Sequence, residues 1–167
     1  MSFLNLARKR RSIRKYKPEP VSEDKLQYVL ETARTAPSWA NRQCWRYIVV
    51  TDEALRKKIT QRDWAAEAPV VIVACADPVL SGNKFGQPYY MLDVGSSMDH
   101  LMLAAAEQGL GTCWIGGQFD EKNVKDALGV PDQIRVVALT PLGYPAEEKG
   151  PVTERKPPAE IVHRDRW

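Results

Sequence analysis

Three short stretches of this chain carry side chains that together could hold a phosphorylated aromatic cofactor. Arg10–Tyr16 (RRSIRKY) gathers cations around one hydroxyl, Ala36–Gln43 (APSWANRQ) carries amide and hydroxyl groups, and Arg155 with Lys156 adds cations near the end of the chain. Guanidinium groups and hydroxyls suit phosphate oxygens, and a further guanidinium suits the electron-rich edge of a heterocycle. Asn and Gln side chains offer paired donors and acceptors to a planar ring with an amide-like rim. These residue types therefore predict a bound, phosphorylated, planar cofactor.

Each stretch also has an ordinary structural explanation. A run of cations is typical of a solvated helix end, where it is favoured by the negative pole of the helix dipole. Pro, Ser and Asn are common turn formers, so the second stretch could be a simple loop. The glycine-rich segment Gly109–Gly117 (GLGTCWIGG) lacks both the dinucleotide-binding and the P-loop spacings. Its Gly116 and Gly117 either allow the backbone to approach a ring closely or merely end a strand.

Composition and charge narrow the class of protein. The chain has 167 residues, 44% hydrophobic and 27% charged, which is typical of a globular protein with one core. Its net charge of +3 is weak for a nucleic-acid binder. Three distant cysteines form no CxxC pair, which argues against a disulfide framework and against a zinc or iron–sulfur site, so no metal is expected. We expect a cytoplasmic protein, because no apolar run approaches membrane-spanning length and no signal peptide is evident.

The periodicity of apolar residues predicts alternating helices and strands. Helices are expected near residues 3–7, 22–36, 52–59, 90–108 and 120–128, and strands at 45–51, 70–76, 112–115 and 134–142. Residues 77–88 should form a loop, and a proline-rich tail follows Gly143. In the long helix we expect Met91 to be buried, Asp93 to cap the first turn, and His100 to be a core histidine. This order predicts an α+β or α/β fold with helices covering a sheet, with no domain boundary within residues 1–167.

Taken in order, these segments resemble the nitroreductase family of FMN-dependent oxidoreductases. The resemblance rests on Arg10–Tyr16, Ala36–Gln43, Ala68–Val73, Gly109–Gly117, Gly143–Pro145 and the tail from Arg155 to His163. It implies an α+β fold with a central, mostly antiparallel sheet covered by helices. It also implies a homodimer with two FMN sites at the subunit interface, with residues 144–167 packing on the partner subunit.

The resemblance also assigns roles to individual residues. It implies that the FMN phosphate and ribityl chain are held by Arg10, Arg11, Ser12, Arg155 and Lys156, and that Arg14 approaches the N1/O2 edge of the isoalloxazine as an electrostatic stabiliser. The partner subunit would supply Pro37, Ser38, Asn41 and Gln43, and the ring face and N5 side would be lined by Trp114, Ile115, Gly116 and Gly117. Two features depart from the family: Cys44 stands where proline is usual, and the region between Ile59 and Asp93 is short.

The expected reaction is transfer of a hydride from NADH or NADPH, through flavin N5, to a nitroaromatic, a quinone or a similar small oxidant. It requires no side-chain nucleophile, because the flavin performs the electron chemistry. Three alternatives remain open. The protein could bind flavin without nicotinamide turnover, it could carry out another family reaction such as reductive dehalogenation, or it could be a basic surface for anionic polymers. The low net charge disfavours the last.

Overall fold

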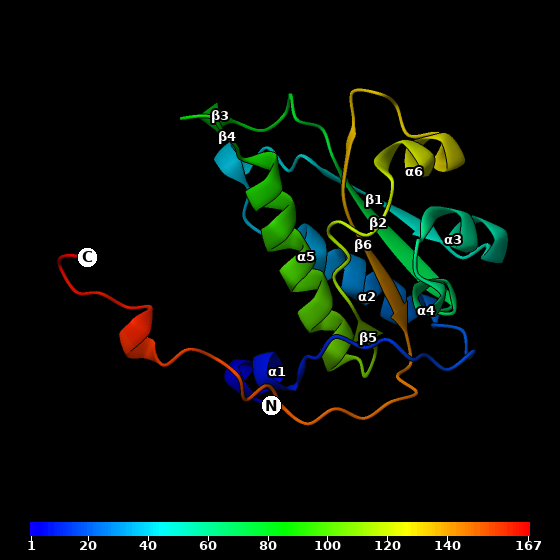
Figure 1. The fold of residues 1–167 in the computed structure, drawn as a ribbon, viewed down its shortest axis with the longest axis horizontal. Coiled ribbons are helices and arrows are strands. Elements are labelled where there is room, and N and C mark those ends of the chain that lie inside the picture. Colours follow the sequence, from blue (N-terminus) through cyan, green and yellow to red (C-terminus); the bar gives the residue numbers. More distant parts are fainter.

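A four-stranded antiparallel sheet forms the centre of the molecule in the computed structural model, which describes residues 1–167 (Figure 1). Its strands are β1 (Trp45–Val50), β2 (Val70–Ala76), β5 (Gly111–Thr112) and β6 (Arg135–Gly143), in the order β1-β2-β6-β5. All seven residues of β2 are buried, because β2 lies between two strands and helices cover both faces of the sheet. The sheet and its helices confirm the predicted α+β class.

Successive residues of β2 point into two separate cores, as the two-residue period of a strand requires. One core contains Ile72 and Ala74 and is closed by α2 (Glu23–Arg34) and α5 (Tyr90–Glu107). The other contains Val71 and Val73 and is closed by α3 (Glu53–Ile59), α4 (Asp63–Ala66) and α6 (Glu121–Leu128). The helices are thereby divided between the two faces of the sheet (Figure 1).

The two ends of helix α5 lie beside different segments, and each group of segments includes residues predicted to bind the cofactor. With 18 residues it is roughly 27 Å long at ~1.5 Å per residue. Its amino-terminal end lies beside the short helix η1 (Trp39–Asn41) and the hairpin of β3 (Asn83–Lys84) and β4 (Gln87–Pro88) (Figure 1). Its carboxyl-terminal end lies beside α1 (Phe3–Lys9) and β5. Segments at the two ends of α5 are therefore far apart within one chain.

Two of the helices expected from sequence begin at an aspartate whose side chain makes the cap. The Asp52 carboxylate accepts a hydrogen bond from the Leu55 amide at 2.8 Å, and Asp120 does the same for Asn123 at 2.7 Å. Gly129 ends α6 with a left-handed φ of 67°, the conformation that favours glycine. Each of these residues acts within one turn of the helix end it caps, so these helix boundaries can be predicted from sequence.

Several elements differ from the sequence prediction because their positions depend on distant contacts. The strand expected at residues 112–115 is reduced to Gly111–Thr112, and Ile115 makes only an isolated bridge to Leu139. The loop at 77–88 contains the β3–β4 hairpin, and α4 was not predicted. Met91, in the first turn of α5, is 48% exposed although it shares a helical face with the buried Met98, and His100 is only half-buried.

The carboxyl-terminal segment first returns along the amino-terminal one and then leaves the body of the molecule. The Val152 amide donates to the Arg8 carbonyl at 3.0 Å, next to α1. Residues 153–167, with the short helix η2 (Pro158–Glu160), then extend away from the sheet (Figure 1), and Trp167 is fully exposed. None of the helices combines the length and the apolar character needed to span a membrane.

Candidate functional site

A strongly basic cavity of about 370 Å³ lies between residues 10–14 and residues 149–155. It is lined by five cationic residues and a single carboxylate, together with a hydroxyl and two further tail residues: Arg10, Arg11, Ser12, Arg14, Lys149, Val152, Thr153, Glu154 and Arg155. Residues 10–14 are held at the sheet edge, where Ser12 pairs in parallel with Thr112 and the Ile13 amide donates to the Thr112 carbonyl at 2.9 Å. The cations predicted from separate stretches thus share one cavity.

Hydrogen bonds fasten the tail over this segment. Lys149 Nζ donates to the Ser12 carbonyl at 2.6 Å, and the Arg14 amide donates to Glu147 Oε1 at 2.6 Å. That amide, aided by Lys149, holds the pKa of the Glu147 carboxyl below its usual value. The Arg11 guanidinium donates to the carbonyls of Gly150 and Pro151, the latter at 3.2 Å. Arg11 and Lys149 therefore hold the tail, and Arg155 Nη1 donates to the Glu154 carbonyl at 2.7 Å. The Arg10 and Arg14 guanidinium groups make no hydrogen bond within the chain and can face a ligand.

A second cavity, of about 350 Å³, shares Arg14 with the first. Its other lining residues come from α4 and from the glycine-rich segment: Trp64, Cys113, Trp114, Ile115, Gly116, Gly117 and Gln118. A Cβ at Gly116 would lie 2.8 Å from Trp114 Nε1, so a larger residue would push that half-exposed ring aside. The Arg14 guanidinium carbon lies 5.7 Å from the centre of the Trp64 ring, within range of a cation–π contact.

The four residues expected from the partner subunit lie elsewhere in this chain. They lie in or beside η1, next to the amino-terminal end of α5 (Figure 1) and away from the segments that line both cavities: Pro37, Ser38, Asn41 and Gln43. The backbone here is strained, because Ala40, Asn41 and Gln43 have φ angles of 47°, 54° and 49°. The Ser38 hydroxyl accepts a hydrogen bond from the Gln43 amide at 2.9 Å, which supports the strained loop. One chain therefore does not bring these amides to the basic cavity.

Asp93 anchors this strained loop, instead of capping α5 as expected. Its carboxylate is buried and accepts from the Trp39 amide and the Ser81 hydroxyl, both at 2.8 Å, and from Cys44 Sγ at 3.4 Å. Burial, with a smaller contribution from Asp93, raises the pKa of the Cys44 thiol to about 12. The side chain is drawn inward because three donors from other segments converge on it. The departure at Cys44 thus places a buried thiol against this carboxylate.

Most of the cations that line the basic cavity were predicted from the sequence, but the residues that hold them in place were not. Arg10, Arg11, Ser12, Arg14 and Arg155 are brought together, whereas Lys156 lies just beyond the lining. The residues not singled out are Lys149, Glu147 and Trp64, and Asp93 was expected only as a helix cap. Their roles depend on tertiary contacts, and no motif or spacing marks them in the sequence.

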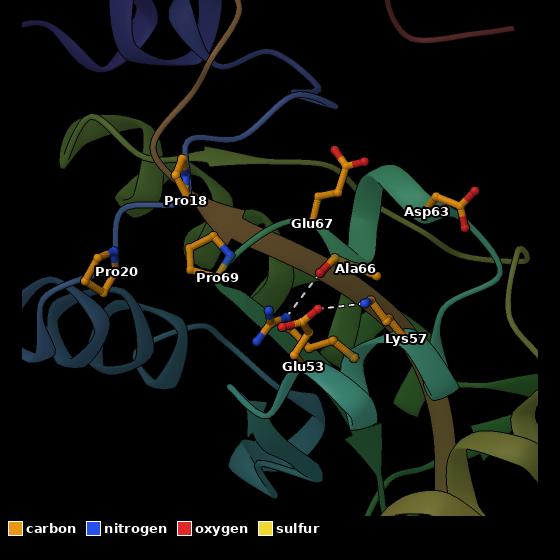
Figure 2. Close-up of a pocket in the computed structure, with 9 residues that line it drawn as sticks. Pro18, Pro20, Glu53, Lys57, Asp63, Ala66, Glu67 and Pro69 are labelled. Atoms are coloured by element: carbon orange, nitrogen blue, oxygen red, sulfur yellow. Dashed lines mark hydrogen bonds and ion pairs between the residues drawn. The ribbon is translucent and has the colours of Figure 1, made fainter.

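The largest surface cavity is a separate groove of about 810 Å³ between the Pro18–Pro20 segment, α3 and α4 (Figure 2). Its two cations are already engaged. Lys57 pairs with Glu53 at 2.6 Å, and Arg56 donates to the carbonyls of Ala66 and Thr51. Because Asp63 and Glu67 add further negative charge, this groove is unsuited to a phosphate.

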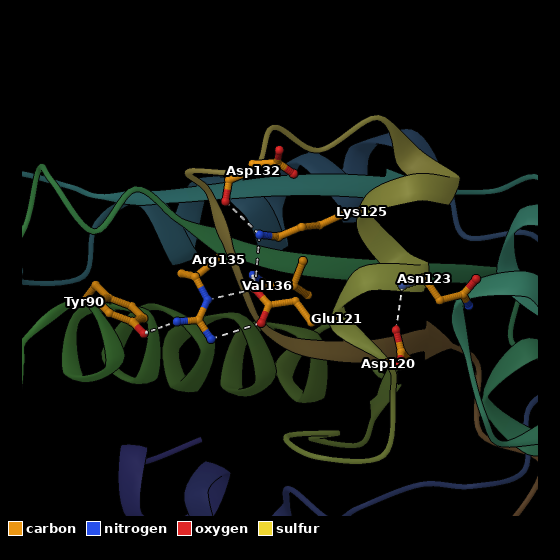
Figure 3. A network of polar contacts seen from close by, with 8 residues as sticks. All are labelled: Tyr90, Asp120, Glu121, Asn123, Lys125, Asp132, Arg135 and Val136. Carbon is orange, nitrogen blue, oxygen red and sulfur yellow. Dashed lines mark hydrogen bonds and ion pairs between the residues drawn. The ribbon is translucent and has the colours of Figure 1, made fainter.

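A polar network at the start of β6 has a structural role (Figure 3). Arg135 makes two hydrogen bonds to the Glu121 carboxylate, at 2.9 and 3.0 Å, and the Val136 amide adds a third at 3.0 Å. These contacts, led by that of Arg135, lower the pKa of Glu121 to about 2 despite partial burial. The network joins α6 to β6, and Arg135 Nη1 also reaches the Tyr90 hydroxyl, at the start of α5, at 3.5 Å.

Comparison with known proteins places the chain in a family. The model of the nitroreductase family matches residues 7–65 and 60–144, and the chain belongs to this family. An NADH dehydrogenase from Thermus thermophilus is 33% identical, over 93% of this chain and 92% of its own. A nitroreductase family protein from Clostridium novyi is 39% identical over 88% and 87% of the two chains, with a TM-score of 0.82.

Two further relatives bear on the chemistry of the family. An FMN-dependent nitroreductase from Clostridium difficile is 29% identical over 99% of this chain and 100% of its own, with a TM-score of 0.87. An iodotyrosine deiodinase from Thermotoga neapolitana is 26% identical over 87% and 89% of the two chains. The family thus includes proteins whose names state different reactions.

Proposed function

We propose that this protein is an FMN-dependent oxidoreductase that takes a hydride from NADH or NADPH and passes it to a small oxidant such as a nitroaromatic or a quinone. The observation that carries the proposal is the convergence of Arg10, Ser12, Arg14 and Arg155, from both ends of the chain, on one cavity. That donor set fits an anionic phosphate, and the adjoining cavity with its aromatic and glycine lining fits a flat ring. The FMN-dependent relative supports the same cofactor.

The side chains would divide the binding between them. Arg10 and Arg155, with the Ser12 hydroxyl, would hold the phosphate and the sugar-like chain, and Lys156 would add charge from the edge. Arg14 would face the N1/O2 edge of the ring and stabilise the negative charge that collects there on reduction. The segment Trp114–Gly117 would line the ring face near N5. FMN, when bound, supplies the hydride chemistry, which explains why no side-chain nucleophile is needed.

The second half of each site would come from another copy of the chain. Pro37, Ser38, Asn41 and Gln43 lie at the end of α5 opposite the cavities, so a two-fold dimer is the simplest arrangement that brings them to the ring. Residues 144–167 would belong to the same single domain and pack on the partner, since their outer part leaves the body of its own chain (Figure 1). The three cysteines are buried and unpaired, which fits the cytoplasm, where nicotinamide reductants are supplied.

The first test is FMN binding by the purified protein and by arginine variants. We expect yellow protein, with Arg10→Ala and Arg155→Ala each weakening FMN binding by about ten- to a hundred-fold, because a charge-assisted hydrogen bond contributes ~1.5–3 kcal/mol. The matched control is Arg34→Ala, which removes an exposed arginine paired with Glu31 on α2. Full FMN binding by both variants would refute the phosphate assignment.

The second test separates the reaction from its rivals. Anaerobic addition of NADH or NADPH should bleach the flavin absorbance, and a nitroaromatic or a quinone should restore it. A flavin that stays oxidised with both nicotinamides would indicate binding without nicotinamide turnover. Reductive dehalogenation is the second candidate, favoured by the deiodinase relative. Restoration of the colour by a halogenated phenol, with release of halide, would favour that reaction.

A further inference from the structure

The Arg14 guanidinium occupies the junction of the two cavities without a carboxylate partner. Arg14 lines both cavities, and its side chain forms no ion pair or hydrogen bond within the chain. Only its backbone amide is engaged, by Glu147. The contact that its guanidinium makes is with the face of Trp64, at 5.7 Å. The charge of Arg14 is therefore not neutralised by a carboxylate, and the Trp64 ring supports the guanidinium.

Trp64 is itself held firmly by its surroundings. It lies in α4, where its neighbours Ala65 and Ala66 are buried, and its half-buried ring packs against the core on the α3 and α6 face and against the small cluster around Ile13. The residue before this helix, Arg62, donates to Gln118 Oε1 at 2.9 Å and so ties α4 to the glycine-rich segment. The ring is consequently a fixed platform within the second cavity.

A ring platform and a carboxylate would affect Arg14 differently. A carboxylate would fix the guanidinium but would also cancel its charge and occupy its donors. An aromatic face attracts the cation and leaves all five N–H groups free to donate in the plane of the guanidinium. A positioned but uncompensated cation is what electrostatic stabilisation of a developing negative charge requires.

We propose that Trp64 is a positioning residue that holds the Arg14 guanidinium toward the N1/O2 edge of the flavin and so favours the reduced over the oxidised cofactor. This inference rests on the proposed function, because it assumes that Arg14 faces bound FMN. Trp64 acts through Arg14, so its effect should vanish when the cation is absent. That dependence separates positioning from a general contribution to packing.

A double-mutant cycle on the full-length protein tests the proposal. Trp64→Leu is made with Arg14 present and again in an Arg14→Met background, and FMN dissociation constants are measured for the oxidised and the dithionite-reduced cofactor. With Arg14 present, the preference for reduced FMN should fall by up to about five-fold, the full effect being reached if the ~1 kcal/mol of a cation–π contact supports Arg14 only against the reduced ring. This corresponds to roughly 20 mV in midpoint potential at ~30 mV per tenfold for two electrons. In the Arg14→Met background the preference should not change.

Each outcome decides between the alternatives. An equal loss of preference in both backgrounds, or no loss in either, overturns the positioning role and leaves the FMN assignment intact. Failure of the native protein to bind FMN in either state overturns the proposed function and this inference with it. Circular dichroism checks the fold of each variant. If Trp64→Leu does not fold, Trp64→Phe, which keeps a weaker aromatic face, should lower the preference about two-fold with Arg14 and leave it unchanged without it.

Discussion

If the two halves of each site come from different subunits, variants damaged in opposite halves should restore one another. The first variant, Arg10→Ala/Arg155→Ala, removes two cations from the basic cavity. The second, Asn41→Gly/Gln43→Gly, removes two amide side chains from the η1 loop. Glycine is chosen because both positions have left-handed backbone, near 50°, where alanine would add strain.

The expected losses follow from the groups removed. Two charge-assisted hydrogen bonds of ~1.5–3 kcal/mol each weaken FMN binding by a hundred-fold or more, and two neutral amide bonds of ~0.5–1.5 kcal/mol each weaken it by about five- to a hundred-fold. Each variant alone should therefore retain little FMN when the free concentration is set just above the dissociation constant of the native protein. In a mixed dimer, one site contains both pairs of substitutions, and the other site contains only native residues.

The assay co-expresses the two variants with different affinity tags and isolates the mixed dimer by successive purification. We expect the mixed dimer to hold half as much FMN per protomer as the native protein at the same free FMN concentration, with native affinity, measured by flavin absorbance against protein concentration. Co-expression of the two differently tagged copies of one variant is the control, and it should remain colourless. If each chain built its own complete site, each site of the mixed dimer would contain one of the two pairs of substitutions. A colourless mixed dimer would therefore refute the shared site.

The remaining predictions concern stability. Because the folded pKa of Glu121 is lowered to about 2, its contribution is complete above its usual pKa of ~4.5 and is lost as the pH falls toward 2. Urea titrations should show a steeper loss of stability over that range in the native protein than in Glu121→Gln. Asp93→Ala should cost ~2–4 kcal/mol in urea denaturation, because it leaves buried donors unpaired, whereas Asp93→Asn should cost less. Gly111→Ala should cost ~1–3 kcal/mol, since its Cβ would lie 2.8 Å from Ile13, and Gly117→Ala, which meets open space, is its control.

The parts of the fold that could be predicted from sequence are those fixed by neighbouring residues. Asp52 and Asp120 cap their helices and Gly129 ends one, because each acts within one turn. The continuous apolar run at Val70–Ala76 predicts the strand expected at 70–76, and it is the central β2, in which every residue is buried. The short β5 could not be bounded in this way, because its pairing with β6 stops after Thr112↔Leu142 although β6 continues to Arg135, and the chain returns to β6 only at the isolated Ile115–Leu139 bridge.

The candidate site was predictable in its composition but not in its organisation. Cations at residues 10–14 and at 155 are the residue types that a phosphate requires, and the structure places them around one cavity. The sequence contains no sign that Arg11 would hold tail carbonyls or that Trp64 would lie against Arg14. Both contacts join segments that are far apart in the sequence.

The backbone of the η1 loop gives an independent reason to regard it as part of a site. Asn tolerates left-handed φ, but Ala40 and Gln43 do not, and each such residue costs of order 1–3 kcal/mol. A loop that served only to reverse the chain would be more stable with glycine at these positions. The buried Asp93 offsets this strain by accepting hydrogen bonds from Trp39 and Ser81. Stability alone does not account for a strained loop held by a buried carboxylate, which supports the proposal that the side chains of Asn41 and Gln43 face a neighbouring flavin.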